Sequence, residues 1–145
     1  MIWTGLSRYS SFGLLVMRVG LGVAFILHGM GKFQGGAEVL TMVGSAMGNL
    51  GITKGHYFLG FAAASGECLG GLLVLLGALF RPACLLLLGI LAVALFMLLS
   101  KGAGFMDYAH PLELLFVFFG LLFVGPGRYS IDGEGLRKKS YSTGG

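Results

Sequence analysis

The sequence predicts an all-α membrane protein: a bundle of four transmembrane helices, with a short amphipathic interfacial helix between the first and second spans. Hydrophobic residues make up 56% of the 145 residues and charged residues only 11%, which is too apolar for a soluble domain of this length. Most of the 27 glycines lie inside runs rich in Leu, Val and Phe, where glycine indicates close packing between helices. The alternating pattern of a membrane barrel is absent, so the spans are expected to be helical.

Four apolar runs reach or approach the roughly 20 residues that a helix needs to cross a bilayer. They are Phe12–Met30, Tyr57–Phe80, Pro82–Ser100 and Pro111–Val124. The last run is the shortest, and Met106–Ala109 would add a turn ahead of its proline. Only Phe80-Arg81-Pro82 links the second and third runs, which predicts a tight antiparallel hairpin.

Two further segments complete the expected organisation. Glu38–Leu50 carries apolar residues at helical spacing, which predicts a short helix that either lies on the membrane surface or caps the bundle. The segment Gly125–Ser130 is expected to end the fourth span sharply. We therefore expect one membrane domain over residues 1–132 and a polar, disordered tail over residues 133–145.

The basic residues outside the spans predict the orientation of the chain. Six of them fall on the face that holds both termini: Arg8, Arg81, Arg128, Arg137, Lys138 and Lys139. Three fall on the other face: Lys32, Lys54 and Lys101. The positive-inside rule then places both termini in the cytoplasm. The expected location of the chain is a bacterial or archaeal plasma membrane. The net charge of +4 is thereby explained by the membrane surface, and no nucleic-acid partner is expected.

The two cysteines, Cys68 and Cys84, have neither disulfide nor metal-ligand spacing, so both are expected to be packing residues and no metal site is predicted. The first apolar run is long and is followed by further spans, and no small-residue cleavage site follows it. We therefore expect the first span to stay in the protein rather than to be removed as a signal peptide.

Four ionisable residues lie at membrane depth, where such groups are functional candidates by default: Arg18, His28, Glu67 and Glu113. Arg18 is expected about 9 Å from one boundary and Glu67 near mid-bilayer, within reach of an arginine side chain. This predicts an Arg18–Glu67 ion pair, which would either serve function or only pin two helices together. The pattern Gly66 to Gly70 predicts that Glu67 faces the bundle interior.

A polar stripe is expected on the first span, because Arg18, Phe25, His28 and Lys32 fall within about 80° of one another on a helix. His28 and Lys32 are either an interfacial histidine and a snorkelling lysine, or a position that handles protons or binds an anion. The topology brings Asp107, His110 and Glu113 of the fourth span to the same depth. Asp107 and His110 have the alternative reading of helix-start residues at a solvated boundary.

With these residues in place, the sequence resembles the DoxX family over nearly the whole chain, from about Ser11 to Asp132. The matching elements are Arg18, His28-Gly29 with Lys32, Glu67 with Gly70-Gly71, Phe80-Arg81, Glu113, and the stretch from Gly125 to Asp132.

The resemblance implies a membrane subunit of a quinone-linked oxidoreductase system that passes electrons from a sulfur compound or thiol to the quinone pool. Thiosulfate:quinone oxidoreductase is the enzyme it suggests. Quinone reduction consumes protons, and carboxylates or histidines inside the bundle would supply them. The candidate catalytic residues are Glu67, Arg18, His28 and Glu113, and the candidate residues for binding a quinone are Lys32, His110 and Asp107.

The sequence carries no redox motif of its own, so electrons are expected from a partner redox subunit or from a bound reductant. A homo-oligomer and a small-molecule ligand are also compatible with the pattern. The competing function is a non-enzymatic assembly component or a bundle that binds a small solute or lipid, in which the buried charges only fix helix packing. A transporter is less favoured, since four short spans show neither an inverted repeat nor a pair of broken helices.

Overall fold

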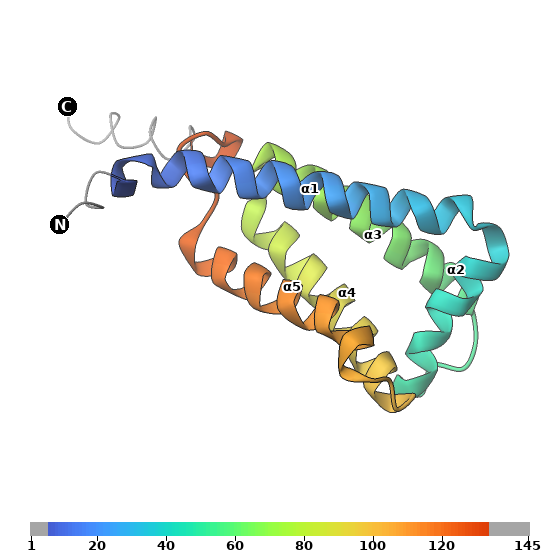
Figure 1. The fold of residues 1–145 in the computed structure, drawn as a ribbon. Coiled ribbons are helices and arrows are strands. Elements are labelled where there is room, and N and C mark those ends of the chain that lie inside the picture. Colours follow the sequence, from blue (N-terminus) through green and yellow to red (C-terminus); the bar gives the residue numbers. More distant parts are fainter. Residues whose placement is uncertain (1–5, 134–145) are drawn as a thin grey trace.

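The computed structural model describes residues 6–133, which form a helical bundle (Figure 1). The α-helices are α1 (Ser10–Gln34), α2 (Gly36–Gly44), α3 (His56–Leu76), α4 (Phe80–Ser100) and α5 (Phe105–Val124), and two short 3-10 helices are η1 (Leu6–Tyr9) and η2 (Ser45–Leu50). Within these residues, four helices are long and apolar enough to cross a membrane, namely α1 with η1, α3, α4 and α5. The expected fold class is confirmed. The predicted tail, 133–145, lies almost wholly outside the described residues.

The link between the second and third spans differs from the expected one. The helix α3 ends at Leu76, because Gly77 adopts a left-handed conformation with φ 64°, and α4 already begins at Phe80. Pro82 lies in the first turn of α4, where the missing N–H costs no helical hydrogen bond. The prediction of Phe80-Arg81-Pro82 as the link was therefore wrong, although the tight hairpin itself is present.

The turn foreseen ahead of the fourth span is also present. The helix α5 starts at Phe105 and continues through Pro111, so the proline lies inside the helix. At its start, the Asp107 carboxylate accepts a hydrogen bond from the backbone N–H of Gly104 at 3.0 Å. Such a side-chain cap satisfies one of the N–H groups that a helix start leaves unpaired.

Glycines bring α1 and α3 into close antiparallel contact. A Cβ atom built on Gly22 would lie 2.7 Å from the carbonyl oxygen of Gly71, and one on Gly29 would lie 2.6 Å from that of Ala64. The two backbones therefore touch where only glycine fits. These contacts set the register of the pair, with Gly22 facing Gly71 and Gly29 facing Ala64.

The segment between the first two spans caps the end of the bundle. A Cβ atom on Gly44 of α2 would overlap the carbonyl oxygen of His56, and one on Gly60 of α3 would overlap that of Leu40. The helix α2 thus packs directly on α3, while η2 contacts α4. Of the two alternatives for this segment, capping of the bundle is the one that the structure has.

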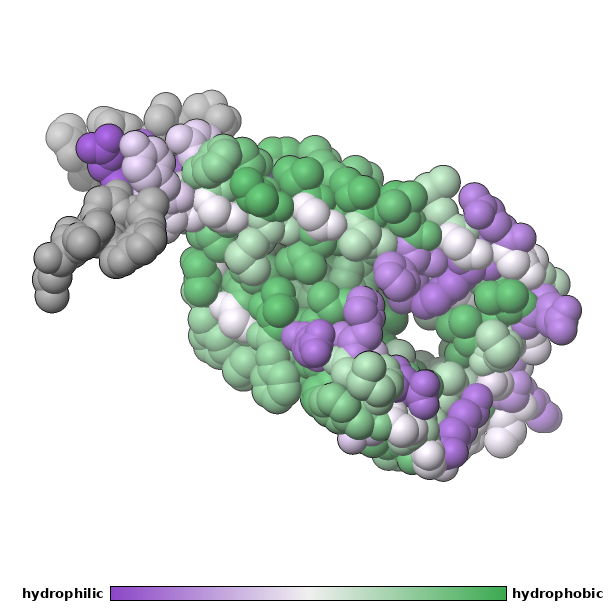
Figure 2. All heavy atoms as spheres, viewed as in Figure 1, coloured by the Kyte–Doolittle hydropathy of each residue, from purple (hydrophilic) through white to green (hydrophobic). Residues whose placement is uncertain are grey.

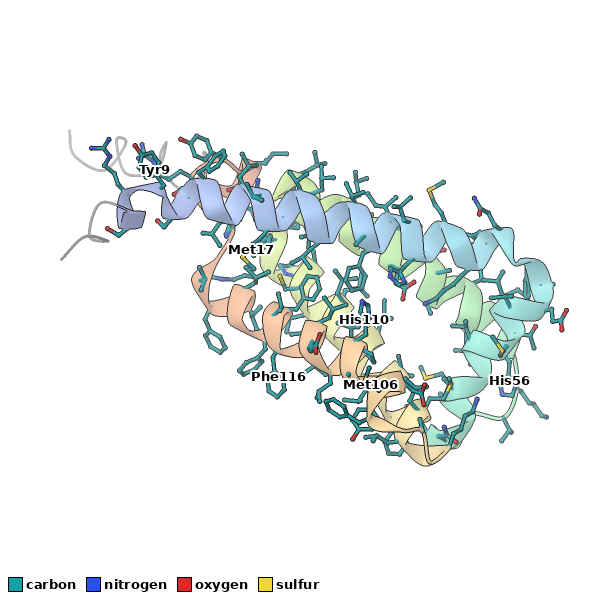
Figure 3. The ribbon with its side chains drawn as sticks, viewed as in Figure 1. Tyr9, Met17, His56, Met106, His110 and Phe116 are labelled. Carbon is teal, nitrogen blue, oxygen red and sulfur yellow. The ribbon has the colours of Figure 1, made fainter. Side chains whose placement is uncertain are left out.

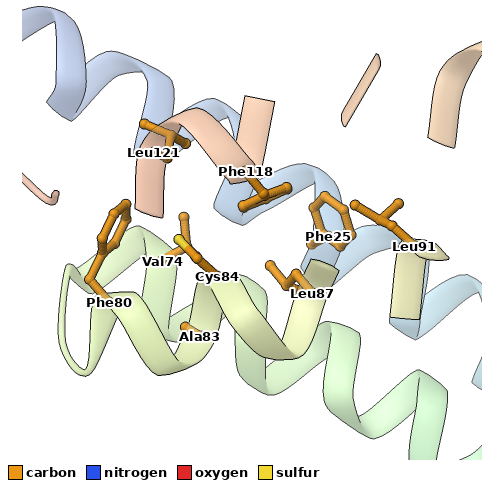
Figure 4. Close-up of a cluster of buried hydrophobic side chains, with 9 residues drawn as sticks. All are labelled: Phe25, Val74, Phe80, Ala83, Cys84, Leu87, Leu91, Phe118 and Leu121. Carbon is orange, nitrogen blue, oxygen red and sulfur yellow. The ribbon is translucent and has the colours of Figure 1, made fainter. Parts of the chain in front are cut away.

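The helices are grouped as two pairs, α1 with α3 and α4 with α5, which diverge toward the end where α2 lies (Figure 1). A cluster of buried side chains joins the pairs toward the other end (Figure 4), and it consists of Phe25, Val74, Phe80, Ala83, Cys84, Leu87, Leu91, Phe118 and Leu121. Both cysteines are free, with Cys84 inside this core and Cys68 half-buried. Their expected role in packing is confirmed.

Candidate functional site

A partly buried ion pair joins the last turn of α1 to the middle of α3. The Lys32 Nζ atom lies 2.5 Å from Oε1 of Glu67, and the two side chains are only 23% and 8% exposed. Glu67 faces inward as expected, because the neighbouring glycines of α3 admit Leu87 and Ile90 of α4. Its second carboxylate oxygen, Oε2, is buried and has no hydrogen-bond partner among the described residues. An incompletely satisfied carboxylate at membrane depth marks a candidate functional site.

The predicted ion pair between Arg18 and Glu67 was wrong. The register of α1 on α3 places the Arg18 guanidinium against Gly77, since a Cβ on that glycine would overlap its Nη1 atom. Glu67 lies ten residues back along α3, a distance of about 15 Å at 1.5 Å per residue. Lys32, on the same stripe of α1 but four turns further along, is the cation that reaches the carboxylate.

Arg18 instead fixes the chain after α5. Its side chain is buried, with 1% exposure, and its Nη2 donates a hydrogen bond to the backbone carbonyl of Tyr129 at 2.5 Å. The Nε and Nη1 atoms have no hydrogen-bond partner in the described part of the chain. The structure therefore does not bring Arg18 together with the other candidate residues.

Asp132 is a structural residue that the sequence reasoning missed. Its carboxylate oxygens accept hydrogen bonds from the backbone N–H groups of Leu79 and Phe80, at 3.1 and 2.9 Å. Its own N–H donates to the carbonyl of Gly77 at 3.0 Å. The segment after α5 thus folds back over the α3–α4 turn and caps α4. An aspartate next to a helix start in sequence is a known signal of a helix cap. Here the signal was hidden, because 52 residues separate Asp132 from Phe80 in the chain.

His28 and His110 bring the first and last spans together, as expected from their depth. The two rings stack with centroids 5.8 Å apart and planes inclined by 28°. Beside them, Phe25 makes an edge-to-face contact with Phe118, with the ring centroids 5.1 Å apart. Figure 3 shows His110 on the side of α5 that faces α1.

The remaining two candidates on α5 have different surroundings. The Asp107 carboxylate caps the start of α5, as described above, which favours the helix-start alternative for this residue. Glu113 is exposed in the middle of α5 and forms no ion pair or hydrogen bond with residues 6–133. Neither carboxylate is joined to the Lys32–Glu67 pair.

A cavity of about 710 Å³ opens where the two helix pairs diverge. One charged residue, Lys32, contributes to its wall, and every other lining residue is apolar or glycine: Val43, Gly44, Ala46, Met47, Leu59, Ala62, Ala63, Leu85, Leu86, Gly89, Ile90, Val93, Ala94 and Met97. Figure 2 shows the molecule hollowed toward the α2 end, with hydrophilic atoms gathered beside the opening. The ion pair therefore borders an apolar space large enough for a small molecule.

This geometry lies within a stretch that a protein-family model recognises. The DoxX model matches residues 13–100, which is more than half of the chain. The chain belongs to the DoxX family. The match includes Lys32, Glu67 and every residue that lines the cavity, whereas His110, Glu113 and Asp132 lie beyond it. No curated protein and no solved structure matches this DoxX chain.

The site of this DoxX protein is suited to an uncharged, mostly apolar ligand with a polar atom at one end. An ammonium group at the wall of an apolar cavity can donate a hydrogen bond to a carbonyl oxygen, and the carboxylate of Glu67 holds that ammonium in place. Among residues 6–133, no three His, Cys, Asp or Glu side chains gather closely enough to hold a metal ion.

Proposed function

We propose that this DoxX protein is the membrane component of a quinone-linked redox system and that its cavity binds a lipid-soluble quinone. The observation that carries the proposal is the apolar cavity of about 710 Å³ with Lys32 as the charged group in its wall. This volume lies in the range of small-molecule sites, roughly 300 to 1,000 Å³. A quinone ring with the start of its isoprenoid tail has the matching chemistry, being apolar apart from its carbonyl oxygens.

The position of the cavity supports entry of the ligand from the bilayer. Leu85 and Leu86, on the cavity side of α4, are 57% and 39% exposed, and Gly89 has open space where a Cβ would lie. These residues belong to a membrane-spanning helix, so the open side of the cavity faces lipid rather than water. A ligand dissolved in the bilayer reaches such a site without crossing an aqueous phase.

The ion pair supports a role in proton handling. A bound quinone takes up two electrons and two protons when it is reduced. Lys32 would orient a carbonyl oxygen by hydrogen bonding, and Glu67 would neutralise the ammonium and exchange a proton with it. The electrons would come from a sulfur compound or thiol, delivered directly or by a partner redox subunit, as the family resemblance implies.

The proposal includes an orientation with both termini in the cytoplasm of a bacterial or archaeal cell. It is supported by Arg8, Arg81 and Arg128, which stand at the ends of α1, α4 and α5 that lie together, following the positive-inside rule. Labelling of single cysteines placed next to Arg128 and Lys54 with a membrane-impermeant reagent tests it. Labelling from outside at the first position would contradict the orientation.

Occupation of the cavity is tested by blocking it. The wild-type protein is purified in mild detergent or in polymer-bounded native discs, and bound quinone is extracted and quantified by mass spectrometry. The Gly89→Trp variant places an indole in the cavity, while Gly20→Trp is the matched control, since Gly20 also has open space but lines no part of the cavity. We expect quinone with the wild type and the control and its loss in Gly89→Trp. Equal quinone content in all three proteins would refute the assignment.

The second candidate function is a non-enzymatic assembly or ligand-binding component whose buried charges only fix helix packing. It is favoured by Arg18, which holds the segment after α5 through the Tyr129 carbonyl. Reduction of an added quinone by thiosulfate or a thiol distinguishes the two, measured with wild type and Glu67→Gln in membranes containing the partner subunits. Activity that Glu67→Gln loses while remaining folded supports the redox role. Bound quinone without reduction in either protein supports the second function.

A further inference from the structure

Glu113 is an exposed carboxyl group in the middle of a membrane-spanning helix. It lies eight residues after the start of α5, about 12 Å along the axis, and therefore deep in the hydrocarbon core. No residue from 6 to 133 forms an ion pair or hydrogen bond with it. A carboxyl group facing lipid at this depth is costly, which favours a cover other than lipid.

The surroundings of Glu113 are also polar. His110 precedes it by three residues on α5 and stacks on His28 of α1, and both histidines are exposed. We call these three residues, Glu113, His110 and His28, the polar face. None of them lines the apolar cavity, so the polar face is a separate feature of the molecule.

We infer that a second copy of this chain covers the polar face and forms a two-fold symmetric dimer in the membrane. The face is complementary to itself in charge, because it carries an acid and two imidazoles that can pair with it. A two-fold axis along the membrane normal keeps every residue at its own depth in both copies. Glu113 and His110 differ in depth by about 4.5 Å, the rise of three residues, which side chains can span. Each carboxyl group then meets an imidazole of the other copy, and the contact occurs twice.

The surface beside the polar face has open space at Gly120, one turn beyond the exposed ring of Phe116. Gly120 lies two turns after Glu113 on the same side of α5, and a Cβ built on it would meet no atom within 4 Å. A small residue at such a position lets two helix backbones come near enough for short polar side chains to bond.

A charge-swap experiment in lipid tests the inference. Wild type, Glu113→His, His110→Glu and the double variant are labelled with one dye per chain and reconstituted in phosphatidylcholine and phosphatidylglycerol vesicles. Single-molecule photobleaching then gives the dimer fraction as the protein is diluted in lipid. We expect each single variant to weaken dimerisation by about tenfold, since two symmetric contacts are lost, and the double variant to restore it. Asp107→Asn, which changes a carboxylate already used as a helix cap, is the matched control and should leave the dimer unchanged.

Restoration by the double variant cannot arise from misfolding of the single variants, so it identifies the contact. A monomeric wild type at all dilutions, or a dimer that is insensitive to both single variants, would overturn the inference. The former result would leave another protein as the cover of the polar face. The dimer does not rest on the proposed quinone site, because quinone content and dimer fraction are measured separately.

Discussion

Breaking the Lys32–Glu67 pair from either side should destabilise the protein strongly, whereas removing both charges should not. Lys32→Met leaves a buried carboxylate without a counter-ion, and Glu67→Leu leaves the ammonium without one. Loss of one partner of a buried ion pair costs about 3 to 5 kcal/mol, and the lower end applies here because the lysine side chain keeps 23% exposure. The double variant replaces the pair with apolar groups and should cost less than either single change, so the coupling energy should exceed about 2 kcal/mol.

The assay is reversible unfolding in mixed micelles by titration with sodium dodecyl sulfate, followed by helical circular dichroism. Arg18 provides the matched control, since it lies on the same stripe of α1 but about 15 Å from Glu67 along the bundle axis. Arg18→Met combined with Glu67→Leu should be additive to within about 0.5 kcal/mol. Additive costs for Lys32 and Glu67, or coupling between Arg18 and Glu67, would refute the register of α1 on α3 described above.

Three further predictions concern helix packing and capping elsewhere in the bundle. Arg18→Ala removes a hydrogen bond from a charged group to the Tyr129 carbonyl, so the variant should lose about 2 kcal/mol of stability. Amide hydrogen exchange over residues 125–133 should become faster, and unchanged exchange would contradict this prediction. Asp132→Ala removes the cap of α4 and should lower stability by about 1 kcal/mol, with faster exchange in the first turn of α4, while Asp132→Asn should recover part of the loss. Gly60→Ala puts a methyl group into the backbone of α2 and should destabilise the protein by more than about 1 kcal/mol in thermal unfolding. Gly89→Ala, whose methyl group meets open space, should not destabilise it. Equal melting temperatures of the two variants would count against the α2–α3 contact.

The architecture of the bundle could be predicted from sequence because the bilayer leaves few alternatives. Runs of about 20 apolar residues must form helices, and glycines inside them must face other helices. Gly22, Gly29 and Gly71 behave in this way. The boundaries were less certain, because a proline inside the first turn of α4 and another within α5 are both compatible with a continuing helix.

The partner of Glu67 could not be predicted in the same way. Arg18 and Lys32 lie on one stripe of α1, so the helical period alone offers both as counter-ions. The contacts of Gly22 with Gly71 and of Gly29 with Ala64 place Glu67 opposite Ile26, between the two cations. Lys32 reaches the carboxylate because helical side chains lean toward the N-terminus of their own helix, which is toward Glu67 for Lys32 and away from it for Arg18. A depth estimate from span boundaries was too coarse, since a shift of a few residues moves a side chain by a full turn.

The cavity and the cap by Asp132 depend on tertiary structure in a stronger sense. The cavity exists because two helix pairs diverge from a shared core, which no local pattern encodes. The cap joins groups 52 residues apart in the chain. In contrast, the common depth of His28 and His110 on the first and last spans followed from the topology, and the structure adds that their rings stack.

Photoaffinity labelling with an azido-substituted, prenylated quinone tests the proposed quinone site most directly. The reagent is activated with the protein in native-membrane discs, and the labelled peptides are identified by mass spectrometry. We predict labelling of the α3 segment with Ala62 and Ala63 and the α4 segment with Leu85 and Leu86, suppressed by excess unlabelled quinone and by Gly89→Trp. Labelling spread over the lipid-facing side of α5, with no competition by unlabelled quinone, would contradict a quinone site beside the Lys32–Glu67 pair.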